Sequence, residues 1–209
     1  MKSKSEYFGY SDKLPPEERD IFMWLCQELS AITGKWDFFI TLFGNEGNIV
    51  LFNELAPVSF HIIEESIRND LILSIYRLSE PSTSHGKSSK ANLSLLLLAE
   101  KYSSDSKIAS LTIQFKAECK PIRQYRNKRI GHNDLAQKLD PKNNPLKRLG
   151  RNTFDKPIDT ATKILQQIIA KHDNVDIRFT PIAVRGGADQ LLFYLKEARN
   201  LHKEYFDKE

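Results

Sequence analysis

The sequence contains little of the material from which metal sites and disulfides are built. Only two cysteines occur in 209 residues, Cys26 and Cys119, and both fall inside apolar helical patterns. Reduced, buried thiols of an intracellular protein are the expected state of such cysteines. Neither cysteine has the spacing to histidines or carboxylates that a metal site requires, so no metal and no cofactor are expected.

Long apolar runs and targeting signals are also missing. No stretch approaches 18 consecutive uncharged apolar residues, and the first residues lead into no apolar signal segment. No glycine-rich nucleotide-binding loop follows a predicted strand, and no internal repeat is visible. The composition therefore indicates a soluble, cytoplasmic protein without a membrane partner.

Positive charge is present in modest excess, and it is concentrated in one region. Lys and Arg outnumber Asp and Glu by 31 to 27, which gives a net charge of +4. Residues 116–151 contain eleven basic and three acidic side chains, a local charge of +8, so the rest of the chain carries −4. A focused positive field favours an anionic partner, although the same side chains could simply keep a loop hydrated.

Apolar residues recur at helical spacing along most of the chain, so an all-α fold is predicted. Long helices with mostly short connections favour an up-and-down helical bundle, and no boundary is strong enough to divide the chain, so residues 1–209 are expected to form a single domain. The predicted helices cover residues 15–34, 36–43, 55–78, 93–102, 105–129, 158–171 and 188–205.

Particular residues are expected to shape these elements. Gly34 should end the first helix, Asn92 should cap the fourth, and Pro121 should kink or restart the fifth. A long basic loop is predicted over 131–156, and loops of that length in compact domains are usually functional or disordered. Residues 175–179 alternate as one short strand would.

One arginine occupies a position where the helical pattern calls for a buried apolar residue. The apolar stripe of the helix over 105–129 continues past Ile122 to Arg126 and then to Ile130. A guanidinium buried without a partner is costly, so Arg126 should meet a carboxylate, a phosphate or a subunit interface. Asp70 on the preceding long helix is one candidate partner, with an intrahelical or solvent-facing role as the alternative.

Histidine and amide groups surround this arginine in the sequence. Asn127 is next to Arg126, Gly131 is suited to end the helix, and His132 and Asp134 follow. A cation that binds phosphate, beside a side chain that titrates near neutral pH, is the minimum equipment for breaking a phosphodiester. The spacing alone is expected by chance, so the weight of the motif comes from the anomalous arginine and the concentrated charge.

The motif resembles the signature of the HEPN superfamily of helical domains, an arginine and a polar residue followed by a histidine. Arg126, Asn127 and His132 fit this signature, and residues 70–78 are similar to the AbiU-type abortive-infection branch. That branch commonly has alanine where this chain has Gly131. The resemblance implies a HEPN-like core over residues 15–135, the basic loop over 131–156, and extra terminal helices over 157–206.

The resemblance also implies a metal-independent endoribonuclease of a bacterial antiphage defence or toxin–antitoxin system. His132 would then transfer protons at the 2′-hydroxyl or the leaving 5′-oxygen, Arg126 would hold the scissile phosphate, and Asn127 would orient one of them. In-line cleavage needs both an acid and a base, which a homodimer with two copies of the motif would supply. The alternative is a non-catalytic dimer that binds RNA or a protein, such as an antitoxin or another defence-system partner.

Further residues are expected to support this site. Asp70, which could pair with Arg126, and Asp134, which lies beside the motif, are candidate supporting residues. Basic side chains around the motif would contact RNA phosphates, or would only be solvated. These are Lys128, Arg129, Lys147, Arg148 and Arg151.

Charge reversal in the basic loop tests its role in binding. Lys147→Glu combined with Arg148→Glu should weaken RNA binding and flatten its salt dependence, because each lost phosphate contact removes about 0.7 from the log–log slope for a single strand. Binding titrations over a range of salt concentrations measure both quantities, while thermal unfolding should barely change. An unaltered affinity and slope would identify the loop as a hydrated insertion.

Overall fold

The computed structural model describes residues 12–83, 91–131, 139–140, 142, 149–173, 177–179 and 186–206, with only the backbone at 131 and 202–206. Within these residues every regular element is helical, apart from one isolated antiparallel bridge between Thr83 and Ala91. The prediction of an all-α fold is therefore confirmed. None of the helices in these ranges combines the length and apolar character needed to cross a bilayer.

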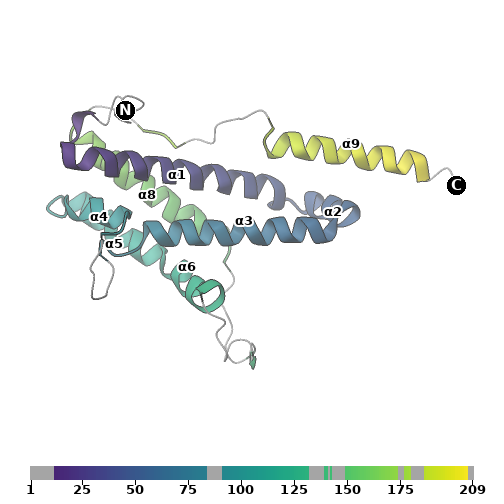
Figure 1. The fold of residues 1–209 in the computed structure, drawn as a ribbon, viewed down its shortest axis with the longest axis horizontal. Helices are drawn as coiled ribbons and strands as arrows, with labels where there is room; N and C mark the ends of the chain where they lie inside the picture. The colour runs from purple at the N-terminus through teal and green to yellow at the C-terminus, as the bar shows by residue number, and fades with distance from the viewer. Residues whose placement is uncertain are drawn as a thin grey trace. The chain divides into compact units, whose positions relative to one another are not determined.

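The helices labelled in Figure 1 belong to two compact units, a division that follows from the contacts within the chain. The first unit contains residues 1–32 and 72–179, and the second contains residues 33–71 and 180–209. Because α1 and α3 contribute to both, no linker in the sequence marks the division, and the single domain stays a prediction. The elements are α1 (Pro16–Phe43), α2 (Glu46–Leu55), α3 (Pro57–Leu78), α4 (Leu95–Glu100), α5 (Ser106–Glu118), α6 (Lys120–Tyr125), the π-helical η3 (Arg126–Gly131), α8 (Asn152–Ala170) and α9 (Ala188–Phe206).

The helix α1 runs through the point where it was expected to stop. Gly34 lies inside it, and the prediction of a break there was wrong. Glycine within a helix costs only about 1 kcal/mol relative to alanine, and the buried Trp36 continues the apolar stripe. The helix ends instead at Phe43, and at the following Gly44 a Cβ atom would lie 2.5 Å from the carbonyl oxygen of Ile40.

The helix α2 was not predicted, and α3 begins at Pro57 rather than at residue 55. Asn45 caps α2 by accepting a hydrogen bond of 2.7 Å from the Gly47 amide. Ala56 leaves the helical path with a φ of −158°, and Pro57 then takes the first position of α3, where its missing N–H is no loss. The sequence analysis assigned residues 48–54 to no element, and the structure places them in α2.

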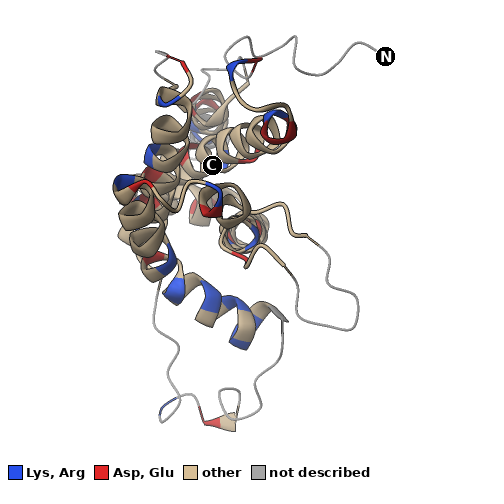
Figure 2. Cartoon of the chain, turned by 90° about the vertical axis from the view of Figure 1, so that its left-hand side faces the viewer, with Lys and Arg blue, Asp and Glu red and all other residues tan. Residues whose placement is uncertain are grey.

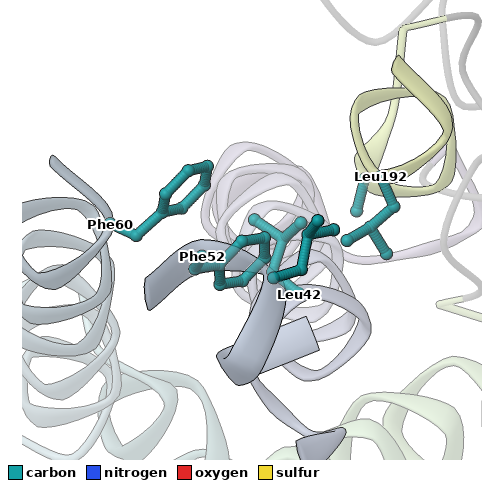
Figure 3. Packing of buried hydrophobic residues seen from close by; sticks show 6 residues of the cluster. Leu42, Phe52, Phe60 and Leu192 are labelled. Atoms are coloured by element: carbon teal, nitrogen blue, oxygen red, sulfur yellow. The ribbon is translucent and has the colours of Figure 1, made fainter. Parts of the chain in front are cut away.

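A hydrophobic core holds the second unit together (Figure 3). It is built from Leu42 of α1, Phe52 of α2, Phe60 of α3 and Leu192 of α9, all of them buried. The rings of Phe52 and Phe60 stack with their centroids 4.0 Å apart. Because these side chains come from four helices, the cluster fixes α9, near the end of the chain, to α2.

In the first unit, α5 and α8 lie side by side and α4 contacts both (Figure 1). Phe115 of α5 and Ile164 of α8 are fully buried. A polar contact accompanies the apolar one, because the carboxylate of Glu118 accepts hydrogen bonds from Thr160 (2.7 Å) and Gln114 (2.9 Å). This packing supports the two helices that flank the basic region of the sequence.

Two helix starts in this unit differ from the predictions. Ser94 caps α4, whereas the Asn92 side chain donates to the Pro81 carbonyl oxygen over 2.9 Å. The helix α8 begins at Asn152, inside the predicted loop over 131–156, and keeps Pro157 in its interior. Pro157 is buried, and it removes only one hydrogen bond from a helix with a long apolar face.

The remaining predictions for elements have mixed outcomes. The restart at Pro121 and the C-terminal helix are confirmed, since α5 ends at Glu118, Pro121 lies in the first turn of α6, and α9 covers the expected residues. Residues 177–179 form no strand, and 174–176 lie outside the described residues.

A buried polar cluster joins three parts of the first unit. The Tyr102 hydroxyl donates to the Glu18 carboxylate over 2.5 Å and lies 2.8 Å from Nε2 of His172. Lys101 lies 3.6 Å from the second oxygen of Glu18, a residue that is only 6% exposed. Burial, and then the hydrogen bond to Glu18, raises the pKa of Tyr102 above its ordinary value of 10.0.

Replacing this hydroxyl tests how strongly the cluster stabilises the fold. Tyr102→Phe should lower the free energy of unfolding at pH 7 by about 1–3 kcal/mol, because it leaves a buried carboxylate without its donor. The raised pKa makes the contribution of Tyr102 complete below about pH 10 and lost as the pH rises further, so the difference between wild type and variant should shrink there. Denaturant unfolding at several pH values measures this.

The exposed Tyr194, whose hydroxyl accepts a hydrogen bond from Gln190 over 2.9 Å, provides the control. Tyr194→Phe should change the stability by less than about 0.5 kcal/mol. Equal effects at the two tyrosines would contradict a special role for the buried cluster.

Candidate functional site

The helical path changes from α to π at the arginine of the motif. The helix α6 ends at Tyr125, and η3 continues through Arg126 and Asn127 to Gly131. A π-helical turn is closed by hydrogen bonds between residues i and i+5, and such turns occur frequently at functional sites. The apolar stripe had predicted an α-helix up to residue 129, so this widening was not foreseen.

Arg126 is half-buried against the last turn of α3. Its guanidinium carbon lies 4.5 Å from the centroid of the Tyr76 ring, and its Nη1 atom donates to the Asn127 side-chain oxygen over 3.1 Å. The Nε atom is buried and has no hydrogen-bond partner among the described residues. Asp70, a candidate partner, instead pairs with Lys35 at 2.5 Å within the second unit.

Arg123, one turn before Arg126, binds the residue that follows α3. Its Nη2 atom donates to the carbonyl oxygen of Ser79 and lies 3.4 Å from the Ser79 hydroxyl. That hydroxyl donates in turn to the carbonyl oxygen of Tyr76 over 2.8 Å. Carbonyl groups at a helix end carry partial negative charge, so Arg123 stabilises this terminus and fixes α6 beside Tyr76.

Cys119 lies next to the same contact. Burial raises the pKa of its thiol to about 12, although Ser79 and Arg123 act in the opposite direction. The thiol is therefore neutral at physiological pH and acts as a small apolar group. Cys26 and Cys119 are both buried, which confirms the prediction that they lie in the core.

The segment formed by α6 and η3 is strongly basic. Figure 2 shows Lys and Arg bands that follow one another along this segment, in the lower part of the view. Lys128 and Arg129 are exposed, and the Arg129 guanidinium lies 6.0 Å from the Tyr125 ring centroid. Residues 120–131 contain five basic side chains and no acidic one, which is the charge distribution that a nucleic-acid backbone attracts.

The structure describes only part of the predicted site. His132, Asp134, Lys147 and Arg148 lie outside the described residues. Arg151 lies at the start of α8, where its exposed side chain is 3.3 Å from the Asp155 carboxylate. No group of His, Cys, Asp and Glu side chains within the described ranges could hold a metal ion.

Two residues near the arginine were not singled out from the sequence. Arg123 could have been found, because it precedes Arg126 by three positions and therefore shares its side of the helix. Tyr76 could not have been assigned to Arg126 by any local pattern, because their contact joins distant parts of the chain.

The model of the HEPN AbiU2 family matches residues 19–182 of this chain. The match covers most of the chain and includes the motif formed by Arg126, Asn127 and His132. The chain therefore belongs to the AbiU2 abortive-infection branch of the HEPN superfamily, as its resemblance had predicted. Comparisons with curated proteins and with solved structures gave no match.

The two neighbouring arginines should differ in what they contribute to stability. Arg123→Met leaves the Ser79 carbonyl without its charged donor and should cost about 1.5–3 kcal/mol. Arg126→Met loses the contact with the Tyr76 ring but also removes a buried N–H without a partner, so the net change should stay within about 1 kcal/mol. Urea unfolding of both variants measures the difference, and a larger loss at Arg126 would contradict this division of roles.

Proposed function

We propose that this protein is a metal-independent endoribonuclease of bacterial antiphage defence, with Arg126 and His132 at its catalytic site. One observation carries the proposal: the arginine of the family motif is half-buried and oriented at a π-helical turn in the most basic segment of the chain. Membership of the abortive-infection branch supports the biological setting. The basic segment supports RNA as the substrate.

The reaction that suits these groups is attack by a ribose 2′-hydroxyl on the adjacent phosphorus. A base removes the 2′ proton as the new oxygen–phosphorus bond forms, and an acid gives a proton to the 5′-oxygen as its bond to phosphorus breaks. The products are a 2′,3′-cyclic phosphate and a 5′-hydroxyl. His132 transfers protons, Arg126 stabilises the charge that develops on the phosphate, and Asn127 helps to orient the arginine.

Each chain has one histidine in the motif, so the proposal includes a two-fold homodimer with a shared site. In a dimer one copy of His132 acts as base and the other as acid. Large apolar side chains left exposed in the second unit are compatible with contact to another chain. These are Val50, Val58, Ile62, Ile63, Phe193, Tyr194 and Leu201.

Incubation of the purified protein with total RNA in EDTA tests the activity. Cleavage should proceed without a metal ion, with a rate maximum between about pH 6 and 8, because one histidine must be neutral and the other protonated. His132→Ala should retain RNA binding but lower the cleavage rate by about 10² to 10⁴. Arg126→Ala should also lower the rate, through loss of charge stabilisation at the phosphate.

Two measurements complete this test. Sedimentation should give the mass of a dimer at micromolar concentration, and a stable monomer would count against the shared site. Strict dependence on magnesium, or full activity of His132→Ala, would contradict the mechanism. RNA binding without cleavage by the wild-type protein would instead favour a non-catalytic RNA-binding dimer.

A further inference from the structure

We propose that Tyr76 is the positioning residue for the phosphate-binding arginine, a role that rests on the proposed ribonuclease function. The Tyr76 ring supports the face of the Arg126 guanidinium, with the guanidinium carbon 4.5 Å from the ring centroid. Tyr76 belongs to α3, whereas Arg126 belongs to η3. The arginine and its aromatic support therefore come from two different elements, and the sequence motif that begins at Arg126 does not contain Tyr76.

An aromatic partner suits a cation that must bind phosphate. A carboxylate would neutralise Arg126 and would occupy the N–H groups that a phosphate needs, whereas a ring attracts the cation through its face and accepts none of these hydrogen bonds. Arg126 makes no ion pair with a carboxylate of the described residues. Its full charge and part of its guanidinium edge therefore stay available to an anion.

The position of Tyr76, whose ring lies against the Arg126 guanidinium, is fixed by its neighbours. Tyr76 lies between the buried residues Ile75 and Leu78 in the last turn of α3. The Ser79 hydroxyl donates a hydrogen bond to the Tyr76 carbonyl oxygen, and the Arg123 guanidinium donates one to the Ser79 carbonyl oxygen. The same contacts that end α3 therefore also fix the distance between the ring and the segment that carries Arg126.

The contact predicts a defined pattern of activities for substitutions of Tyr76. Tyr76→Phe keeps the ring and should retain kcat within about twofold, whereas Tyr76→Leu should lower kcat roughly tenfold because the guanidinium loses its support. KM should change less, since the other cations of α6 and η3 still bind the RNA backbone. The pH profile should not shift, because the ring does not transfer protons.

Two controls separate positioning from general damage to the fold. Phe39→Leu removes a ring from another guanidinium, that of Arg68 at 5.7 Å from the ring centroid in the second unit, and it should leave kcat unchanged. Thermal unfolding of each variant sets an assay temperature at which all of them are folded. If the wild-type protein cleaves RNA and a folded Tyr76→Leu variant has the same kcat, the positioning role of Tyr76 is overturned. The proposed ribonuclease function would not be affected by that result.

A second readout does not depend on turnover. The Nε–H signal of Arg126 in a proton–nitrogen spectrum, assigned with Arg126→Lys, should respond to RNA made uncleavable by 2′-deoxy substitution. The response should be present in the wild type and in Tyr76→Phe, and absent or strongly reduced in Tyr76→Leu. The same response in all three proteins would overturn the positioning role, whereas a wild-type protein that cleaves no RNA would overturn the proposed function.

Discussion

The candidate site depends on an arginine that is held firmly but is not neutralised. Partial burial orients the Arg126 guanidinium, yet its neighbours among the described residues are an aromatic ring and an amide rather than a carboxylate. A carboxylate would neutralise the guanidinium and would leave less charge for a phosphate. The fold meets these two demands through Arg123, which ties α6 to the end of α3 and so brings the ring beneath the cation.

Sequence reasoning located the arginine, because a charged residue on an apolar stripe is a conflict that can be read locally. It also gave the all-α class and the restart at Pro121, which follow from periodicity and from proline's missing N–H. It could not give the partner of Arg126, because Tyr76 approaches it only through the packing of α3 against the later helices. It misplaced the end of α1 at Gly34, because tertiary packing outweighs the small helical cost of one glycine.

The two units contain different features of the chain. The first unit carries the motif arginine, its aromatic support and the buried cluster of Glu18, Tyr102 and His172. The second unit has its own core of phenylalanine and leucine side chains and leaves several large apolar groups exposed. Because α1 and α3 contribute residues to both units, the division falls within helices and not in a connecting segment.

The π-helical turn has a consequence for the path of the chain beyond this site. A π turn is in effect an α-helical turn with one additional residue, and each residue of an α-helix advances the chain by about 100° around its axis. Loss of a single residue from η3 would therefore restore the ordinary helix and rotate the direction in which the chain leaves Gly131 by roughly that angle. A one-residue change in length, with every named side chain retained, would thus alter how the chain continues from the helix that carries Arg126.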